Sequence, residues 1–374
     1  LKQWIRWDVT FRGRTALGGP LCEEEMKLED VLRSSFKFHN LVYISITQKC
    51  PIRCRHCFVE SSPTRTERVS QGEFPQWIDG ILAGRSVDVV LFSGGEPFSN
   101  PSVLRYGLSA CQNSSVNTIV GTSAFWATSV DVASSFLKRY PGIDLLFIST
   151  DIYHEEFVPL DHLRNAVDAC EANGISVAFQ IVDDAPEDSE FVRRFQSIVD
   201  PLGLLADQVY FTPLGFEGRA SDQVLKRAAY KPLADMQALP CPWLGAPWIH
   251  EDGSVCACPN LSVYQTPGHP LNLGNLKQTT FDKLSVTASN DPLVQSLRTL
   301  GPKGIVDEMP VESWGWKPSA FDSGNICDLC ESLLCTSGFA ERMRNYVLDS
   351  EWNERIKLLR ILQHQEFAEN MAIQ

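Results

Sequence analysis

Six short apolar runs alternate with helical patterns along this chain, and this alternation constrains the fold more than any other feature. The runs cover residues 41–46, 87–92, 118–121, 144–149, 175–182 and 208–212. Continuous apolar runs of this length are typical of parallel strands that are covered on both faces. Between them, apolar residues recur at helical spacing over residues 104–111, 132–137, 163–170 and 191–199. The third of these stripes, Leu163, Ala166, Val167 and Cys170, precedes Gly174, a helix stop. The pattern predicts a parallel α/β sheet, open or closed into a barrel, with ligands at the carboxyl ends of its strands.

The composition changes after residue 240. Residues 241–340 are rich in proline, glycine, tryptophan and cysteine and contain few periodic runs. We therefore expect little regular core there, and a metal centre that stabilises the fold of this region. The end of the chain is helical and charged, with one apolar face formed by Trp352, Ile356, Leu359 and Leu362. We predict four parts: an extension of residues 1–40 with a short helix that starts at the acidic residues 23–25, an α/β domain of residues 41–236, a Cys-rich domain of residues 237–340 and a C-terminal helical segment of residues 341–374.

The chain is acidic. Its formal net charge is −13 and its isoelectric point is about 5.0, which argues against broad binding of a nucleic-acid backbone. No apolar run approaches the roughly 18 residues that cross a membrane, and the first residues lack the pattern of a signal peptide. We therefore expect a cytoplasmic protein without nucleic-acid or membrane partners.

The composition is unusual in its cysteine content, because the chain has twelve cysteines. Nine of them fall in three short-spaced groups: Cys50, Cys54 and Cys57; Cys241, Cys256 and Cys258; and Cys327, Cys330 and Cys335. Tight cysteine spacings in a cytosolic chain favour metal binding over disulfides. Cys111 and Cys170 lie on apolar stripes and are expected in the core.

The first cysteine group directly follows the first predicted strand. Its spacing, C-x3-C-x2-C, allows three thiolates in one loop to bind three irons of a cubane iron–sulfur cluster. No fourth cysteine is near, so one iron would stay open, as in catalytic metal sites. A structural zinc loop would instead use four ligands. A second motif, Gly94-Gly95-Glu96-Pro97, follows the second predicted strand.

Together the two motifs resemble those of the radical S-adenosylmethionine (radical SAM) enzymes. The resemblance implies a partial (β/α)6 barrel of the TIM type, in which the open iron binds the amino and carboxylate groups of the methionine moiety. It implies that reductive cleavage of S-adenosylmethionine releases a 5′-deoxyadenosyl radical. It also implies that the methionine ammonium is held by Gly94, Gly95, Glu96 and Pro97.

The resemblance assigns further cofactor contacts to residues at strand ends. His56 stands where the family often has an aromatic residue against the adenine. Ser149 and Asp151 follow the fourth strand, where the family places a ribose-binding polar residue, although Asp151 could instead cap the next turn. Thr122 and Gln180 are further candidates of the same kind.

Two other polar residues follow predicted strands. His154 lies after the fourth strand, where it could bind substrate or move a proton, so it is our catalytic candidate. A polar residue at a helix entry is the alternative. Arg219, after the sixth strand, could face a carboxylate or lie on the surface.

Cys241 and Cys258 flank a predicted hairpin, because the Asp252-Gly253 pair between them is a turn signal. With the later cysteines, this region resembles the auxiliary-cluster domain called SPASM, or its shortened form, the twitch domain. The full SPASM form carries seven cysteines and two clusters, whereas this region has six cysteines. We therefore predict one auxiliary 4Fe-4S cluster, with the ligands Cys241, Cys258, Cys327 and Cys330. Cys256 or Cys335 could replace a ligand. A pair of partly open clusters and a zinc knuckle are the alternatives. The tryptophans of this region either line a substrate cleft or form its core; they include Trp243, Trp248, Trp314 and Trp316.

The resemblance implies an enzyme that takes a hydrogen atom from an unactivated carbon. The auxiliary-cluster branch acts mainly on peptides, so peptide modification, as in maturation of a ribosomally made peptide, is the leading hypothesis, with the auxiliary cluster as electron acceptor. Dehydrogenation or rearrangement of a small molecule, such as a sugar in antibiotic assembly, is the second hypothesis. A non-catalytic iron–sulfur or zinc scaffold is the third. The resemblance also implies an electron donor such as flavodoxin or ferredoxin.

Overall fold

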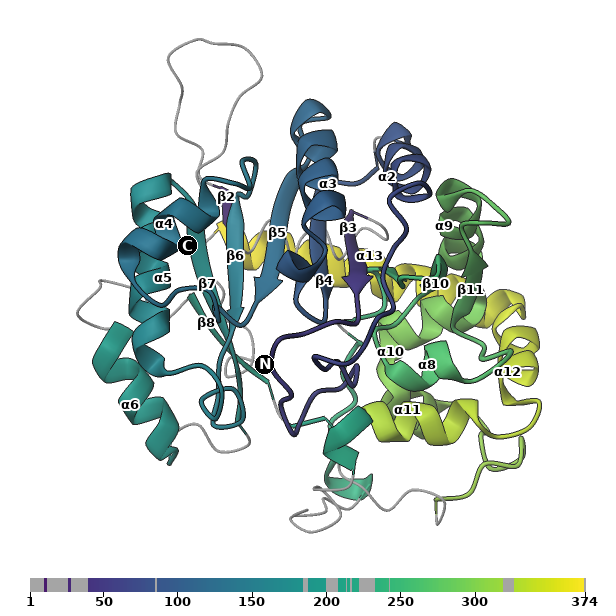
Figure 1. The fold of residues 1–374 in the computed structure, drawn as a ribbon. Coiled ribbons are helices and arrows are strands. Elements are labelled where there is room, and N and C mark those ends of the chain that lie inside the picture. The colour runs from purple at the N-terminus through teal and green to yellow at the C-terminus, as the bar shows by residue number, and fades with distance from the viewer. Residues whose placement is uncertain are drawn as a thin grey trace.

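The computed structural model describes residues 10–11, 26–27, 40–84, 86–183, 188–199, 208–212, 214–215, 217–221, 233–241, 243–318 and 326–372. Its central element is a nine-stranded sheet with the strand order β11-β10-β9-β3-β4-β5-β6-β7-β8 (Figure 1). Six neighbouring strands are parallel and follow the chain order: β3 (Leu41–Thr47), β4 (Val89–Gly94), β5 (Asn117–Thr122), β6 (Leu145–Ser149), β7 (Ser176–Val182) and β8 (Val209–Thr212). They coincide with the six predicted runs, so the α/β fold with a parallel sheet is confirmed, and a partial barrel agrees with it.

Helices alternate with these strands and pack on one face of the sheet. They are α2 (Phe74–Ala83), α3 (Pro101–Asn113), α4 (Val130–Leu137), α5 (Leu160–Asn173) and α6 (Glu190–Val199). Alternate strand residues point to opposite faces, so Ile44 and Phe92 join the core under the helices, whereas Leu91 and Ile119 lie in a second cluster on the other face. The sequence analysis predicted α3 to α6 but not α2. Gly174 ends α5 with a φ of 66°, as a helix stop should.

A hairpin from the Cys-rich region extends the sheet beyond β3. Strand β9 (Trp248–Ile249) pairs parallel with β3, and β10 (Ser254–Cys256) pairs antiparallel with β9 and with β11 (Asn272–Asn275). The predicted Asp-Gly turn is therefore confirmed, and Gly253 has a φ of 90°. The Trp248 ring stacks on Tyr43 of β3, with 5.1 Å between ring centroids. This pairing attaches the Cys-rich region directly to the edge of the parallel sheet.

The Cys-rich region has a core of its own, so the prediction that it has little core was wrong. Its helices are α8 (Leu261–Gln265), α9 (Phe281–Asn290), α10 (Pro292–Glu308) and α11 (Ile326–Leu334), and α12 (Phe339–Val347) and α13 (Ser350–Ala372) pack beside them. Leu293, Leu297, Trp316 and Phe339 are buried in one apolar cluster. The chain interrupts its helices with Pro and Gly, as at the kink of Gly301, which hides the helical period from sequence analysis. Of the two roles considered for the tryptophans, Trp314 and Trp316 take the core role.

Little of the N-terminal extension lies within the described residues. Strands β1 (Thr10–Phe11) and β2 (Met26–Lys27) pair with each other in an antiparallel ladder. Met26 was predicted to lie in a short helix, and that prediction is wrong for this residue because its backbone takes part in the strand pair. The rest of the predicted helix lies outside the described residues. Among the described helices, none combines the length and apolar character that crossing a membrane requires.

Candidate active site

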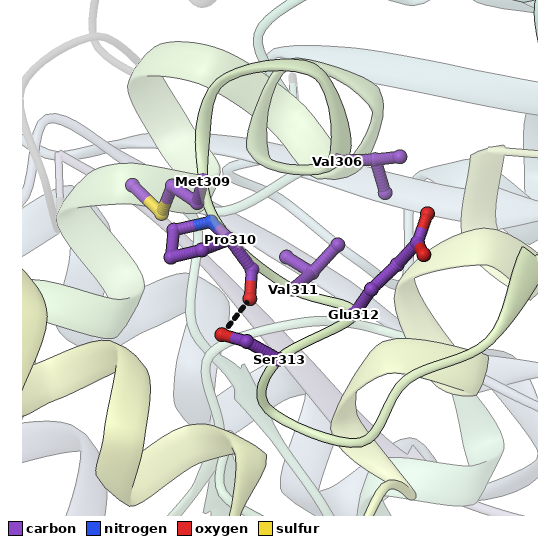
Figure 2. A pocket seen from close by; sticks show the side chains of 6 residues that line it. All are labelled: Val306, Met309, Pro310, Val311, Glu312 and Ser313. Carbon is purple, nitrogen blue, oxygen red and sulfur yellow. Dashed lines mark hydrogen bonds between the residues drawn. The ribbon is translucent and has the colours of Figure 1, made fainter.

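A surface pocket lies where α10 ends, lined by Val306, Met309, Pro310, Val311, Glu312 and Ser313 (Figure 2). The Ser313 hydroxyl donates a hydrogen bond to the Pro310 carbonyl at 2.6 Å. The lining carries one carboxylate but neither a thiol nor an imidazole. This pocket therefore does not contain the thiol ligands of the predicted iron–sulfur sites.

The three-cysteine loop leaves the carboxyl end of β3. Cys50 and Cys54 are buried, with 9% and 5% of their surface exposed, and Cys57 is partly buried. The Cys50 amide donates to the Ser62 carbonyl at 3.1 Å, and the Cys57 amide donates to the Cys54 carbonyl at 3.3 Å. Burial raises the pKa of the Cys50 and Cys57 thiols, and the charge of Glu96 adds to this effect at Cys50. Both thiols therefore keep their protons at neutral pH until a metal displaces them.

The two adjacent glycines at the end of β4 pack against the start of this loop. Gly94 has a φ of 125°, and a Cβ on it would overlap the Thr47 carbonyl oxygen. A Cβ on Gly95 would lie 2.5 Å from the Lys49 carbonyl oxygen. The Gly95 amide donates to the Thr47 carbonyl at 2.6 Å, and the Glu96 amide donates to the Lys49 carbonyl at 2.9 Å. Only glycine permits so close an approach, so the two sequence motifs form one continuous site.

Glu96 is a fully enclosed carboxylate within this site. It is 1% exposed and accepts hydrogen bonds from the Thr122 hydroxyl at 3.0 Å and from the Ser123 hydroxyl and amide, both at 3.2 Å. Burial raises the pKa of Glu96 to about 7, although these bonds oppose the rise. Pro97 begins a short helical turn, η1 (Pro97–Ser99). The structure thus places the predicted cofactor residue Thr122 beside Glu96, at the ends of neighbouring strands.

Asp151 connects the two histidines of the site. Its Oδ2 atom lies 2.9 Å from His154 Nδ1 and 3.2 Å from His56 Nε2, and its Oδ1 atom accepts from the amides of Tyr153 and His154. Burial alone would raise the pKa of Asp151, but His154 and His56 hold it well below its usual range. Burial alone would lower the pKa of His154, but Asp151 and Cys54 raise it above its usual range. Asp151 therefore both caps the turn and binds two imidazoles.

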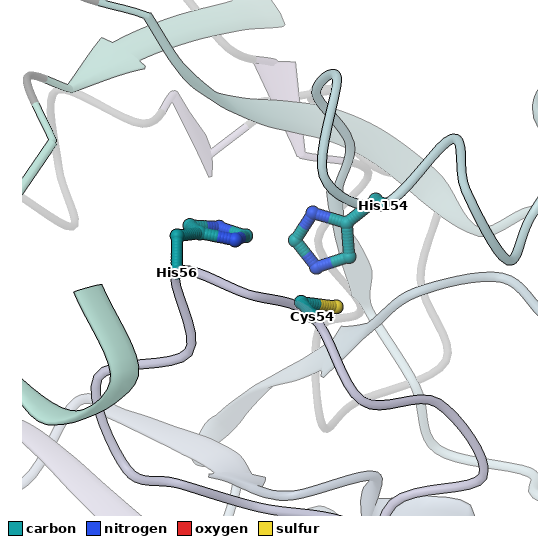
Figure 3. A group of neighbouring side chains, drawn as sticks. All are labelled: Cys54, His56 and His154. Carbon is teal, nitrogen blue, oxygen red and sulfur yellow. The ribbon is translucent and has the colours of Figure 1, made fainter. Parts of the chain in front are cut away.

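The catalytic candidate His154 lies beside a cysteine of the loop. One ligand atom each from Cys54, His56 and His154 lie within 4.8 Å of one another, and Figure 3 shows the two rings flanking Cys54. The His56 ring stacks on Tyr153, with centroids 4.6 Å apart, and meets the His154 ring edge-on at 5.0 Å. The three groups could hold a single metal ion, or His154 could donate a hydrogen bond to a cluster-bound Cys54 sulfur. Either way, Asp151 fixes the orientation of both rings.

Ser149 and Gln180 lie opposite each other near the ends of β6 and β7. The Thr150 amide donates to the Gln180 carbonyl at 2.9 Å. Both predicted cofactor residues therefore lie toward the carboxyl ends of strands, on the side from which the three-cysteine loop leaves β3. Their contact with a cofactor stays a prediction.

Buried polar atoms around the three-cysteine loop test whether a cofactor fits there. Within the described part of the chain, the Ser45 hydroxyl, His56 Nδ1 and Arg219 Nη2 are buried and lack a hydrogen-bond partner. Buried polar groups are nearly always bonded to protein, water or ligand. The site therefore fits a bound cluster and a polar small molecule, because it combines three cysteines, buried donors without a protein partner, and the close backbone approach at Gly94 and Gly95.

Four cysteines of the Cys-rich region come together in the structure. Burial raises the pKa of the Cys258 thiol, and the charges of Cys241 and Cys330 raise it further. The same mutual effect links Cys327 to Cys258 and Cys241. Cys327 and Cys330 lie three residues apart on α11, on one face of that helix. We call Cys241, Cys258, Cys327 and Cys330 the auxiliary group; it is the set that the cysteine count indicated, and its binding of a cluster stays a prediction.

The remaining two cysteines of this region face other surroundings. Cys256 is fully buried in the apolar cluster of the Cys-rich region, where burial raises its pKa to about 12. Cys335 is exposed, and its thiol donates to Glu331 at 3.1 Å. The structure therefore favours neither residue as a replacement ligand.

Gln48 and Arg219, two polar residues near the cysteines, form contacts that sequence analysis did not predict. Gln48 donates to Glu251 of the hairpin turn at 3.0 Å and accepts from Ser61 at 3.0 Å, which joins the Cys-rich region to the three-cysteine loop through buried side chains. Arg219 is partly buried, and its Nε atom donates to the Cys54 carbonyl at 2.9 Å. Contact of Arg219 with a carboxylate stays a prediction. No local pattern marks these residues, since their partners are distant in the sequence.

Residues 44–183 match the family described as the Radical SAM superfamily. This match confirms a radical SAM domain across the three-cysteine loop, the Gly-Gly-Glu-Pro segment and the strands up to β7. The chain therefore contains a radical SAM domain, and such a domain implies a 4Fe-4S cluster and S-adenosylmethionine as cofactors.

Particular relatives are distant. The chain is 21% identical over 336 residues to YydG of Bacillus subtilis (strain 168), a protein whose name assigns it provisionally to peptide biosynthesis; the match covers 86% of this chain and 100% of the relative. It is 39% identical over 62 residues to the GTP 3′,8-cyclase of Chlorobaculum tepidum, covering 17% of this chain and 18% of that one. Among solved structures, Streptococcus suis SuiB aligns with a TM-score of 0.41 and 16% identity, over 72% of this chain and 71% of SuiB.

Proposed function

We propose that this chain is a radical SAM enzyme that takes a hydrogen atom from a carbon of a peptide substrate. The observation that carries the proposal is the pair of backbone hydrogen bonds from Gly95 and Glu96 to Thr47 and Lys49. These bonds join the cluster-binding loop to the methionine-binding segment in one rigid site. The match to YydG, over nearly the whole of both chains, supports a peptide as the substrate.

Each part of the site has a role in this proposal. Cys50, Cys54 and Cys57 hold a 4Fe-4S cluster, which when bound supplies the electron that cleaves S-adenosylmethionine into methionine and a 5′-deoxyadenosyl radical. Glu96 offers a buried carboxylate to the methionine ammonium, and the Thr122 and Ser123 bonds hold that carboxylate in place. His154, oriented by Asp151, donates a hydrogen bond toward Cys54 and restrains the loop.

The auxiliary group completes the electron balance. The adenosyl radical takes one hydrogen atom from the substrate C–H bond, which gives 5′-deoxyadenosine and a substrate radical. An auxiliary 4Fe-4S cluster held by Cys241, Cys258, Cys327 and Cys330 would supply the acceptor for one electron of the substrate radical. With one proton released to solvent, the product would be oxidised by two electrons. The mutual charge effects among Cys241, Cys258, Cys327 and Cys330, each partly buried, support a cluster at this place.

The first test is cofactor cleavage without a peptide. Anaerobically reconstituted protein, reduced with dithionite and mixed with S-adenosylmethionine, should yield 5′-deoxyadenosine and methionine. The Cys54→Ala variant serves as the control and should yield neither product. A wild-type protein with a full cluster and no cleavage would leave only the scaffold hypothesis.

The second test concerns the substrate. Short peptides encoded beside the gene should be co-expressed with the enzyme and examined by mass spectrometry for a loss of two hydrogens or a new crosslink. A modified peptide is then deuterated at the changed carbon, and deuterium should appear in 5′-deoxyadenosine. An adenosyl or methyl adduct without label transfer would replace hydrogen abstraction with group transfer.

A further inference from the structure

A three-residue segment, Glu217–Gly218–Arg219, contacts the surroundings of both cysteine groups; we call it the connector. On one side, the Arg219 amide donates to the Cys57 carbonyl at 3.1 Å, and Arg219 Nε donates to the Cys54 carbonyl at 2.9 Å. One residue thus binds the backbone carbonyls of two predicted cluster ligands, Cys54 and Cys57. The connector therefore restrains the loop through its backbone.

Gly218 brings the connector backbone against the same loop. It has a φ of 56°, a conformation that side chains rarely adopt. A Cβ on Gly218 would lie 2.6 Å from the Cys57 carbonyl oxygen and would overlap the Phe58 carbonyl oxygen. A glycine is required here for two independent reasons, so this contact is a close and specific one.

Glu217 faces the other way, toward the auxiliary group. Its carboxylate accepts from the Asn260 side chain at 2.6 Å and from the Leu261 amide at 3.3 Å. Asn260 caps α8 through Ser262, and its own amide donates to the Cys258 sulfur at 3.5 Å. One partly buried carboxylate thus holds the segment that carries an auxiliary cysteine.

We propose that Glu217 and Arg219 are positioning residues that hold the auxiliary group at a fixed separation from the three-cysteine loop. The inference rests on the proposed function, because it assumes that each group holds a cluster. A short, doubly anchored segment is a stiff link, and a misplacement of about 1 Å at a reacting site can cost about 100-fold in rate. The connector thereby sets the distance from the substrate radical to the auxiliary electron acceptor.

The experiment compares two glycine variants in the full reconstituted chain. Gly218→Ala forces a Cβ onto two loop carbonyls, whereas Gly215→Ala is the matched control, because a Cβ there meets nothing within 4 Å. The readout is the magnetic interaction between the two reduced clusters, measured by pulsed electron paramagnetic resonance, beside the iron content. We expect Gly218→Ala to keep its iron but to change this interaction, and to slow peptide turnover at least tenfold. Gly215→Ala should match the wild type.

Arg219→Ala keeps the proposal testable if Gly218→Ala fails to fold. This variant removes the side-chain hydrogen bond to the Cys54 carbonyl but leaves the backbone amide of residue 219 in place. It should change the magnetic interaction between the clusters in the same direction as Gly218→Ala does. An unchanged interaction and unchanged turnover in both variants would overturn the positioning role. Wild-type protein with iron for only one cluster would instead contradict the proposed function, so the two failures can be told apart.

Discussion

The pH dependence of S-adenosylmethionine binding tests the role of Glu96. Burial raises the pKa of this carboxyl from 4.5 to about 7, so Glu96 in the free protein is largely protonated below pH 7. Its contribution to stability is fully present below pH 4.5 and is lost as the pH rises through 7. A bound methionine ammonium needs the ionised form, so binding below pH 7 must release one proton.

The size of the effect follows from this proton. At one pH unit below the pKa, roughly one molecule in ten carries an ionised Glu96, so the affinity falls about tenfold, or about 1.4 kcal/mol, per pH unit. Between pH 5 and the plateau above pH 7 the dissociation constant should therefore change by about 100-fold. Above pH 7 the affinity should level off, and it should fall again above about pH 8, where an α-amino group loses its proton.

Isothermal titration calorimetry on anaerobically reconstituted protein between about pH 5 and about pH 9 measures this profile, with iron content checked at each pH. Glu96→Gln should bind more weakly at pH 7.5 and should lose the slope below pH 7. Glu217→Gln is the matched control, because burial also raises the pKa of Glu217 to about 7 but this residue lies beside the auxiliary group. A flat wild-type profile, or the same slope in Glu96→Gln, would refute the reasoning.

Three further predictions concern the cysteines and the glycines. Cys50→Ala should abolish cofactor cleavage while the iron of the auxiliary group remains, since three thiolates leave no spare ligand. The purified variant is assayed for iron and for 5′-deoxyadenosine, and retained cleavage would contradict this prediction. Wild-type protein should hold about eight irons and the double variant of Cys327 and Cys330 about four, whereas Cys335→Ala should keep all of them; zinc in place of iron would exclude the auxiliary cluster. Gly95→Val should lower the free energy of unfolding by about 1–3 kcal/mol, measured by urea denaturation, because its side chain meets the Lys49 carbonyl; unchanged stability and affinity would show that the contact is dispensable.

Most of the radical SAM domain could be predicted because its signals are local. Strands such as β3 and β7 are continuous apolar runs, and the spacing of Cys50, Cys54 and Cys57 is set by the covalent chain. Helix α2 was missed although Trp77, Ile78 and Ile81 recur at helical spacing and proline stands at its start. In the Cys-rich region, short helices separated by Pro and Gly carry too few turns for their period to be read.

The pairing of side chains within the site was less predictable. His56, Asp151 and His154 were each selected separately, His56 for the adenine and Asp151 for the ribose, whereas the structure binds them to one another. The choice among six cysteines of the Cys-rich region was also open, because spacing alone does not distinguish Cys256 from Cys258. Their difference arises from strand β10, which turns Cys256 into the apolar cluster and ends before Cys258.

The amino-acid sequence alone carries the motifs on which the proposed chemistry depends: a three-cysteine loop after one strand, Gly-Gly-Glu-Pro after the next, and the further cysteines of the predicted auxiliary site. These features depend on residue type and short spacing, which the covalent chain enforces. The pairing of β9 with β3, and the contacts of Glu217 and Arg219 with the surroundings of the two cysteine groups, arise only in the folded chain. Such contacts join residues far apart in the chain, and they form because burial leaves each polar group only the partners that packing brings within hydrogen-bond distance.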